Sequence, residues 1–209
     1  MRRAGKTLSE AAAAVQWIPP ADAQPVAWHE LFGRVAPVEV DLGCGDGSFF
    51  IARAEQHPER DFVGVERLLG RMRTACRAIP VQRLTNARVV RYESTAFVQH
   101  LLPPGSVDGF YLLFPDPWPK RRHQSRRVVT PLFLRGVAKA LTLGGRFRIA
   151  TDQADYYKTI VRLAWDLPEL EPISGLSDDV LPQTTFEKRF LAAGDEIHRL
   201  VLRKISDVR

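Results

Sequence analysis

Between residues 38 and 165, two patterns of apolar and polar positions alternate along the sequence. Short apolar runs of β-forming residues alternate with longer stretches of helical character. The short runs predict strands at residues 38–42, 61–66, 87–91, 107–114 and 146–150. The longer stretches predict helices at residues 48–56, 68–79, 131–143 and 154–165. This alternation is typical of βαβ units, so the sequence predicts an α/β fold in which helices cover both faces of a mostly parallel sheet.

Two of these elements carry an additional signal. Residues 107–114 are nearly all apolar, as expected for a strand that is covered on both faces. The helix predicted at 131–143 has Pro131 at its first turn, and the glycine pair at 144–145 is expected to end it.

The two ends of the chain depart from this pattern. Residues 1–34 are weakly patterned, and three prolines between positions 19 and 25 prevent a long helix. We therefore expect an N-terminal arm, either extended or formed of short helices, that lies against the main domain. Residues 169–174 and 197–204 are further extended segments without a long helix between them. They predict an antiparallel addition at one edge of the sheet, within a single domain that spans residues 35–209.

Composition limits the class of protein. A chain of 209 residues and 23.6 kDa suffices for one domain with a full hydrophobic core. The two cysteines, Cys44 and Cys76, exclude a disulfide scaffold and a cysteine-built zinc site, and the five scattered histidines argue against a histidine metal site. No apolar run reaches the ~18–20 residues of a membrane helix, and residues 11–15 are too short for a signal peptide. We therefore expect a cytoplasmic protein without a bound metal.

The net charge of +6 is unevenly distributed along the sequence. Five cations fall within residues 120–127, which contain no acid: Lys120, Arg121, Arg122, Arg126 and Arg127. Such a concentrated patch attracts phosphate backbones more strongly than the same charge spread evenly. Charge alone leaves three interpretations open, namely nucleic acid, an acidic protein partner and a solvated basic loop.

A glycine-rich turn follows the first predicted strand. In the run Asp41-Leu42-Gly43-Cys44-Gly45-Asp46-Gly47, Gly43 and Gly45 allow the backbone to approach a ligand closely. Glu66, twenty-three residues after Gly43, ends the second strand, where a carboxylate can accept hydrogen bonds from ribose hydroxyls. Together they predict a ligand that contains adenosine, although the turn could be only a tight connection and Asp46 only a helix cap.

The spacing of the glycines favours one adenosine ligand over another. The run reads G-x-G-x-G, whereas dinucleotide sites read G-x-G-x-x-G, and it is preceded by Glu39 and Asp41. Carboxylates repel a pyrophosphate but suit an ammonium group, which favours S-adenosylmethionine as the cofactor. The run E-V-D-L-G-C-G-D-G is similar to the first motif of class I methyltransferases. Glu93, just after the third strand, could accept a hydrogen bond from the adenine amine or could be a solvated loop acid.

The fourth predicted strand runs into Phe114-Pro115-Asp116-Pro117-Trp118-Pro119-Lys120. Three prolines fix φ and remove backbone donors, so they indicate a rigid turn. Asp116 is expected to project from this turn beside the methyl donor, while Trp118 offers a flat apolar face. A rigid turn with an acid, an aromatic ring and five following cations is better explained by function than by packing.

The run F-P-D-P-W-P-K-R-R-H-Q-S-R-R resembles the signature of the bacterial tRNA (guanine-N7-)-methyltransferase family. Further matches are Ala150-Thr151-Asp152 and, near the C-terminus, Thr184-Thr185-Phe186-Glu187, so that the similarity covers residues 36–204. The resemblance implies a Rossmann-like class I methyltransferase fold. It also implies an enzyme that transfers a methyl group from S-adenosylmethionine to N7 of a guanine in the tRNA variable loop, at position 46.

The resemblance also implies roles for particular residues. The cofactor-contacting positions are Glu39, Glu66, Glu93 and Asp116, of which Asp116 is also the catalytic residue. The substrate-contacting positions are Lys120, Asp152, Thr184, Thr185, Phe186 and Glu187. Three residues depart from the family: Glu93 stands where Asp or Asn is more frequent, Thr185 where Lys is usual, and Asp41 where glycine is common.

The target atom indicates the type of mechanism. N7 of guanine is an acceptor without a proton, so its attack on a methyl group needs no base, and alignment can supply much of the rate. We expect Asp116 and Asp152 to orient the base by accepting hydrogen bonds from N1–H and the exocyclic amine. A carboxylate nearby also stabilises the cationic product. Asp152 could instead cap the helix that follows it.

Three other functions are compatible with parts of the sequence. The chain could be a class I methyltransferase for another RNA base or for a protein. It could be a non-catalytic RNA-binding protein that keeps this fold, but the intact glycine turn and Glu66 argue against that. A nicotinamide-dependent oxidoreductase is disfavoured by the acids around the glycine run. If the chain is a tRNA (guanine-N7-)-methyltransferase, the cations at 120–127 are expected to bind tRNA phosphates. They would contribute affinity rather than sequence discrimination.

Overall fold

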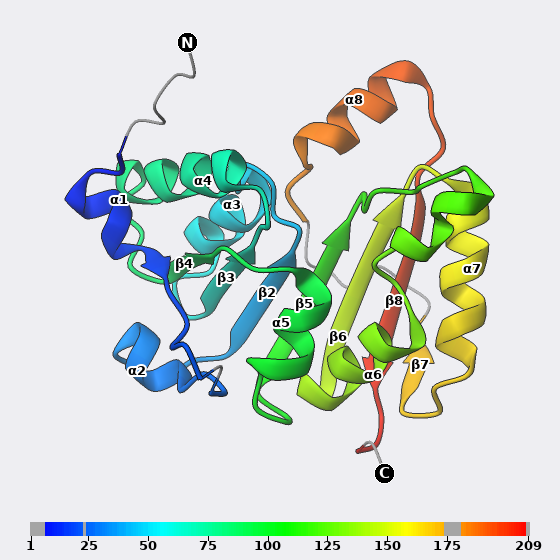
Figure 1. The fold of residues 1–209 in the computed structure, drawn as a ribbon, viewed down its shortest axis with the longest axis horizontal. Coiled ribbons are helices and arrows are strands. Elements are labelled where there is room, and N and C mark those ends of the chain that lie inside the picture. Colours follow the sequence, from blue (N-terminus) through cyan, green and yellow to red (C-terminus); the bar gives the residue numbers. More distant parts are fainter. Residues whose placement is uncertain (1–6, 23, 174–180, 208–209) are drawn as a thin grey trace.

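The computed structural model describes residues 7–22, 24–173 and 181–207. In this part of the chain, eight strands form one sheet with helices on both faces, as Figure 1 shows. The strands are β1 (Gln16–Trp17), β2 (Val38–Leu42), β3 (Asp61–Val65), β4 (Ala87–Val90), β5 (Val107–Leu113), β6 (Leu141–Thr151), β7 (Leu170–Pro172) and β8 (His198–Lys204). The helices are α1 (Glu10–Ala14), α2 (Trp28–Phe32), α3 (Ser48–Gln56), α4 (Leu69–Val81), α5 (Ser94–His100), α6 (Pro131–Ala140), α7 (Ala154–Trp165) and α8 (Thr185–Ala193), with a 3₁₀ helix η1 at Arg121–Arg126.

The strand order is β1-β4-β3-β2-β5-β6-β8-β7. The pairs from β1 through β6 are parallel, whereas β8 runs antiparallel to both β6 and β7. This confirms the predicted α/β class with an antiparallel C-terminal edge. The chain moves outward from β2 to β4 and then returns to β5 on the other side of β2. The carboxyl ends of β2 and β5 therefore border the crevice where open α/β sheets bind ligands.

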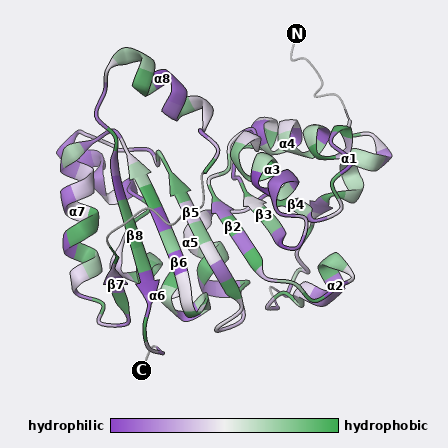
Figure 2. Cartoon of the chain, turned by 180° about the vertical axis from the view of Figure 1, so that it is seen from behind, coloured by the Kyte–Doolittle hydropathy of each residue, from purple (hydrophilic) through white to green (hydrophobic). Residues whose placement is uncertain are grey.

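The hydrophobic core lies in two layers, one on each face of the sheet. Successive strand residues point to opposite faces, so Val63 belongs to the cluster under α5, α6 and α7, whereas Phe62 belongs to the cluster under α1, α3 and α4. Residue 64 must be glycine for the layer under α1, α3 and α4 to pack, because a Cβ at this position would lie 2.6 Å from a ring carbon of Phe50. In Figure 2, helices α4 and α7 carry both hydrophobic and hydrophilic residues, as expected for helices with one face on the sheet.

The N-terminal segment takes part in the sheet. It contains the short helices α1 and α2, and between them β1 pairs in parallel with β4 through Gln16–Val89 and Trp17–Val90. The ring of Trp17 is 9% exposed and makes edge contacts with Trp28 and Phe97. The segment thus extends both the sheet and the core instead of only lying against them.

The helix predicted at 131–143 ends earlier than expected. Helix α6 stops at Ala140, and the next residues already form β6, whose pairing with β5 shifts register between Leu141 and Arg146. Gly144, with φ of +80°, lies inside this irregularity. The glycine pair therefore forms a bulge within a strand instead of a helix end, because pairing with β5 overrides the helical pattern of the preceding residues.

Two helices were not expected from the sequence. Helix α5 begins directly after Glu93, whose side chain caps it. Helix α8 lies between β7 and β8, where we expected no long helix, and Thr184 caps it by accepting a hydrogen bond from the Glu187 N–H at 2.9 Å. Residues 174–180, which include the end of the predicted segment 169–174, lie outside the described part of the chain.

Candidate active site

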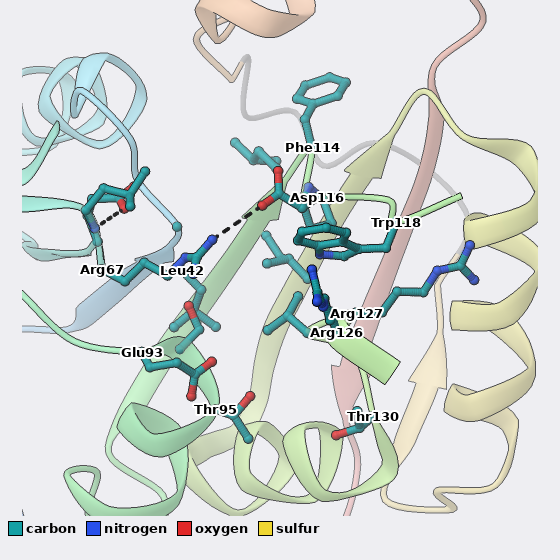
Figure 3. A pocket seen from close by; sticks show the side chains of 18 of the residues that line it. Leu42, Arg67, Glu93, Thr95, Phe114, Asp116, Trp118, Arg126, Arg127 and Thr130 are labelled. Carbon is teal, nitrogen blue, oxygen red and sulfur yellow. Dashed lines mark hydrogen bonds and ion pairs between the residues drawn. The ribbon is translucent and has the colours of Figure 1, made fainter. Parts of the chain in front are cut away.

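Two adjoining clefts open at the carboxyl ends of the central strands. The larger has a volume of about 780 Å³ and is drawn in Figure 3; its lining includes Gly43, Glu66, Glu93 and Trp118. The smaller, of about 490 Å³, extends toward α8. Both clefts are lined by Gly43, Arg71, Leu113, Phe114, Pro115 and Asp116. Asp116 therefore lies at the wall that the two clefts share.

The glycine turn and Glu66 are held together by hydrogen bonds. Gly43 and Gly45 adopt φ of +83° and +60°, the left-handed region that favours glycine. The Gly45 N–H donates to Glu66 Oε2 at 3.1 Å, and the Leu68 N–H donates to Oε1 at 2.7 Å. The carboxylate of Glu66 is thus buried and fixed between the turn and the start of α4. Asp46 accepts from the Ser48 N–H at 3.0 Å, but the N-cap residue of α3 is Gly47, so the helix-cap interpretation of Asp46 is wrong.

Asp41 is the buried acid of the smaller cleft. Its side chain is 4% exposed, and no hydrogen-bond or ion-pair partner for it is present among the described residues. Burial, and secondarily the charges of Glu66 and Asp46, raise the pKa of Asp41 to about 8. A cationic group bound beside it would reverse this effect, so the geometry suits an ammonium ligand.

Glu39 does not join the other predicted cofactor residues. It lies two residues before Asp41 on β2, and its carboxylate accepts hydrogen bonds from Arg53, Arg60 and, at 2.7 Å, the Tyr111 hydroxyl. Glu39 lines a separate cavity of about 620 Å³ at the amino ends of the strands. The structure therefore argues against the cofactor contact predicted for Glu39, because its carboxylate is already paired with arginines and lies toward the amino ends of the strands.

Glu93 caps α5 and also lines the larger cleft. One carboxylate oxygen accepts from the Ala96 N–H at 2.8 Å and caps α5, while the residue remains exposed and lines the cleft beside Ser94 and Thr95. The cap fixes the direction of the side chain. It leaves the second oxygen able to accept from a ligand.

Asp116 lies on a strained turn. Phe114 and Trp118, on either side of it, have φ of +53° and +41°, values that are uncommon for residues with a Cβ. Such strain persists only where the surrounding structure imposes it, and it concentrates at functional sites. The Asp116 carboxylate is 72% exposed and forms an ion pair with Arg67 at 3.8 Å across the cleft (Figure 3).

The basic segment at 120–127 is less uniform than its sequence suggests. The Arg126 guanidinium lies 4.9 Å over the Trp118 ring, and His123 contacts the edge of the same ring. Arg127 is 9% exposed, donates to the Pro117 carbonyl at 2.8 Å and lies 4.5 Å over the Tyr156 ring. Arg127 is therefore a brace of the proline turn, which corrects our expectation that it binds phosphate.

The predicted substrate residues are only partly brought together. Asp152, Thr184, Thr185 and Phe186 line the smaller cleft opposite Asp116. Gln153, not Asp152, is the N-cap residue of α7, so the helix-cap interpretation of Asp152 is wrong.

Two predicted substrate residues lie outside the clefts. The carboxylate of Glu187 pairs with Arg199 and lines neither described cleft. Lys120 precedes η1, is exposed and lines neither cleft either.

Sequence reasoning missed two arginines of the site. Arg67 forms the ion pair with Asp116, and Arg71 lines both clefts. The signal was present, since residues 67–92 contain seven arginines and no acid. Within the described residues, no group of three or more His, Cys, Asp and Glu side chains could hold a metal ion, and no helix is long and apolar enough to cross a membrane.

Solved structures resemble this fold. The aminoglycoside resistance methyltransferase NpmB1 matches with a TM-score of 0.58 and 17% identity, covering 90% of this chain and 95% of that structure. The antibiotic-resistance methyltransferase Kmr matches with a TM-score of 0.57 and 21% identity, covering 83% and 89%. These similarities establish the fold as that of a class I methyltransferase.

Sequence comparisons are more specific. The family model Methyltransf_4, described as "Putative methyltransferase", matches residues 35–200. A tRNA (guanine-N(7)-)-methyltransferase of Cutibacterium acnes is 37% identical over 85% of this chain and 66% of its own length. Proteins with the same name from Alkalilimnicola ehrlichii and Leifsonia xyli are 37% and 39% identical, over 89% and 84% of this chain and 80% and 79% of theirs. Because the family model and these relatives cover most of its length, the chain belongs to the tRNA (guanine-N(7)-)-methyltransferase family.

Proposed function

We propose that this chain transfers a methyl group from S-adenosylmethionine to N7 of a guanine in the variable loop of tRNA. The observation that carries the proposal is the position of Asp116 on a strained turn between two clefts. One cleft suits the adenosine part of the methyl donor, and the other can receive a base. The family to which the chain belongs supports this choice of donor and acceptor.

The residues present fit S-adenosylmethionine. The larger cleft, of about 780 Å³, has the volume of a cofactor site, and Glu66 and Glu93 would accept hydrogen bonds from the ribose and the adenine amine. Asp41, buried and with a raised pKa, would hold the ammonium group in place of Glu39. When bound, this cofactor supplies an electrophilic methyl group on a cationic sulfur.

The residues of the smaller cleft orient the acceptor. Asp116 and Asp152 accept hydrogen bonds from the N1–H and the exocyclic amine of guanine, which leaves N7 directed toward the donor side. Since N7 bears no proton, neither carboxylate has to act as a base. Asp116 also stabilises the positive charge that the base acquires on methylation. Because Arg67 pairs with Asp116 at 3.8 Å, a bound base would compete with it for this carboxylate.

One assay tests this function directly. The purified protein is incubated with unfractionated tRNA and S-adenosylmethionine that carries a radiolabelled methyl group, and the tRNA is digested to nucleosides. We expect the label in N7-methylguanosine. Label in another nucleoside would make the chain a methyltransferase for a different base. No transfer from a protein that binds both S-adenosylmethionine and tRNA would leave it an RNA-binding protein without this activity.

A further inference from the structure

A second basic segment accompanies the one at 120–127. Residues 67–92 contain seven arginines and neither Asp nor Glu. Together the two segments carry twelve cations, while the rest of the chain has eighteen cations and twenty-four acids and is net negative. The excess positive charge of this protein is therefore confined to two segments. One begins at Arg67, the ion-pair partner of Asp116, and the other begins four residues after Asp116.

Three of the seven arginines in the second segment lie on α4, and Arg67 comes just before this helix. The buried side of this helix is formed by Met72, Ala75, Cys76 and Ile79. Arg67, Arg71 and Arg77 are exposed, and Arg73 is half-buried one turn before Arg77. We call Arg67, Arg71, Arg73 and Arg77 the α4 track.

The α4 track begins at the active site and leads away from it. Arg67 pairs with Asp116, and Arg71 lines both clefts. From Arg71 to Arg77 the helix rises about 9 Å, at 1.5 Å per residue. The short helix α1 packs against α4, and its acidic residue is Glu10, in its first turn. In Figure 3, Arg67 lies to the left of Asp116, whereas Arg126 lies below Asp116 and to its right.

We propose that the α4 track is a second phosphate-binding surface for tRNA, on the other side of the cleft from residues 120–127. This inference rests on the proposed function, because it names a surface that would bind the tRNA substrate. Phosphate contacts fix the position of a nucleic acid, so contacts on both sides of the cleft would hold the backbone while a base enters it. Arginine is suited to this role because its planar guanidinium binds phosphate through two hydrogen bonds.

The test compares two matched pairs of cations. Arg73→Ala with Arg77→Ala removes two charges of the α4 track that lie outside both clefts. Arg135→Ala with Lys139→Ala removes two exposed charges, four residues apart, from α6 on the other face of the sheet. Equilibrium binding to tRNA is measured at several salt concentrations, together with S-adenosylmethionine affinity and circular dichroism.

We expect the α4 variant to bind tRNA about 3- to 10-fold more weakly at 0.15 M salt, with a salt slope flatter by up to ~0.7–0.9 per lost phosphate contact. Cofactor affinity should be unchanged, and Arg73→Lys with Arg77→Lys should restore most of the binding. The α6 variant should bind like the wild type. Wild-type binding by the α4 variant, or an equal loss in both variants, would overturn the proposal.

Two further arms separate the sources of failure. Methylation of tRNA by the wild-type protein tests the proposed function itself, so active enzyme with an α4 variant of normal affinity refutes only the track. Polyglutamate serves as an acidic competitor. If the α4 variant loses affinity for polyglutamate but keeps the wild-type affinity for tRNA, the track binds acidic protein and the assignment to RNA is wrong.

Discussion

The role of each acidic residue at this site depends on the groups that its carboxylate already contacts. Glu39 and Asp41 are two residues apart on one strand, yet Glu39 is neutralised by Arg53 and Arg60, whereas Asp41 is buried beside the glycine turn with two other acids nearby. Glu66 is held by two backbone N–H groups. Of the two acids on this strand, only Asp41 is therefore positioned to receive a cationic group.

Asp41→Asn should change stability and cofactor affinity in opposite directions. A carboxyl group with a folded-state pKa of about 8, above its unfolded value, lowers stability progressively as pH rises from about 4 to 8. The amide variant should therefore be more stable than the wild type at pH 8, by a few kcal/mol or less. Thermal unfolding at pH 5 and pH 8 checks this, and a variant that is less stable at pH 8 would contradict it.

The same variant tests the role of Asp41 in binding. Between pH 6 and 7.5 the wild-type carboxylate becomes increasingly ionised, so affinity for S-adenosylmethionine should rise with pH, while Asp41→Asn should bind weakly and without this dependence. Isothermal titration calorimetry measures both. A parallel pH dependence in the two proteins would assign the titration to another group.

Asp116→Asn separates chemistry from binding. The amide keeps the shape of the side chain but loses its charge, so it accepts more weakly and no longer stabilises the cationic product. We expect the single-turnover methylation rate to fall by about 10- to 100-fold, the effect of 1.4–2.7 kcal/mol, even at saturating tRNA. Rescue of the variant by excess tRNA would show that Asp116 contributes to binding rather than to catalysis.

At the scale of elements, the turn after β5 is a small folded unit. Trp118 is covered by Arg126 and contacted by His123, while Arg127 ties the Pro117 carbonyl to the Tyr156 ring on α7. Prolines limit the backbone of this turn, and these contacts hold it in a conformation with two positive φ values. The unit places Asp116 between the clefts.

Neighbouring arginines of this unit should behave differently. Arg126→Ala should weaken tRNA binding and flatten its salt dependence by up to ~0.7–0.9, since its guanidinium lies at the surface of the loop. Arg127→Ala should instead lower stability by about 1–3 kcal/mol, because it removes a buried donor and a cation–π contact, and should lower kcat with little change in salt slope. Urea unfolding and tRNA titrations at two salt concentrations measure both effects; equal salt slopes would contradict the distinction.

At the scale of the whole molecule, the N-terminal segment belongs to the same core as the sheet. Strand β1 pairs with β4, and the buried Trp17 ring packs against Phe97 of α5. Strand β1 therefore connects the N-terminal segment to α5. Helix α5 begins directly after Glu93, in the cleft proposed for adenosine. Unfolding of the N-terminal segment should be coupled to that of the domain.

Trp17→Ala tests this coupling. Removal of a large buried aromatic side chain should lower the free energy of unfolding by about 3–5 kcal/mol, and the variant should still unfold in a single transition. Urea unfolding followed by circular dichroism and by tryptophan fluorescence measures both. Wild-type stability would show that the segment is peripheral, and two separate transitions would show that it unfolds on its own.

Local patterns in the sequence predicted the α/β class, the parallel direction of the central strands and the end of the sheet that carries the site. These features depend on local patterns: apolar runs, a glycine turn at 43–47 and a proline turn at 115–119, each of which limits the backbone wherever it occurs. Tertiary structure alone decided which charged side chains remain available. Arg127 became a brace of the proline turn, and Glu39 was neutralised by Arg53 of α3. Such outcomes depend on partners far away in the chain, and no local pattern records them.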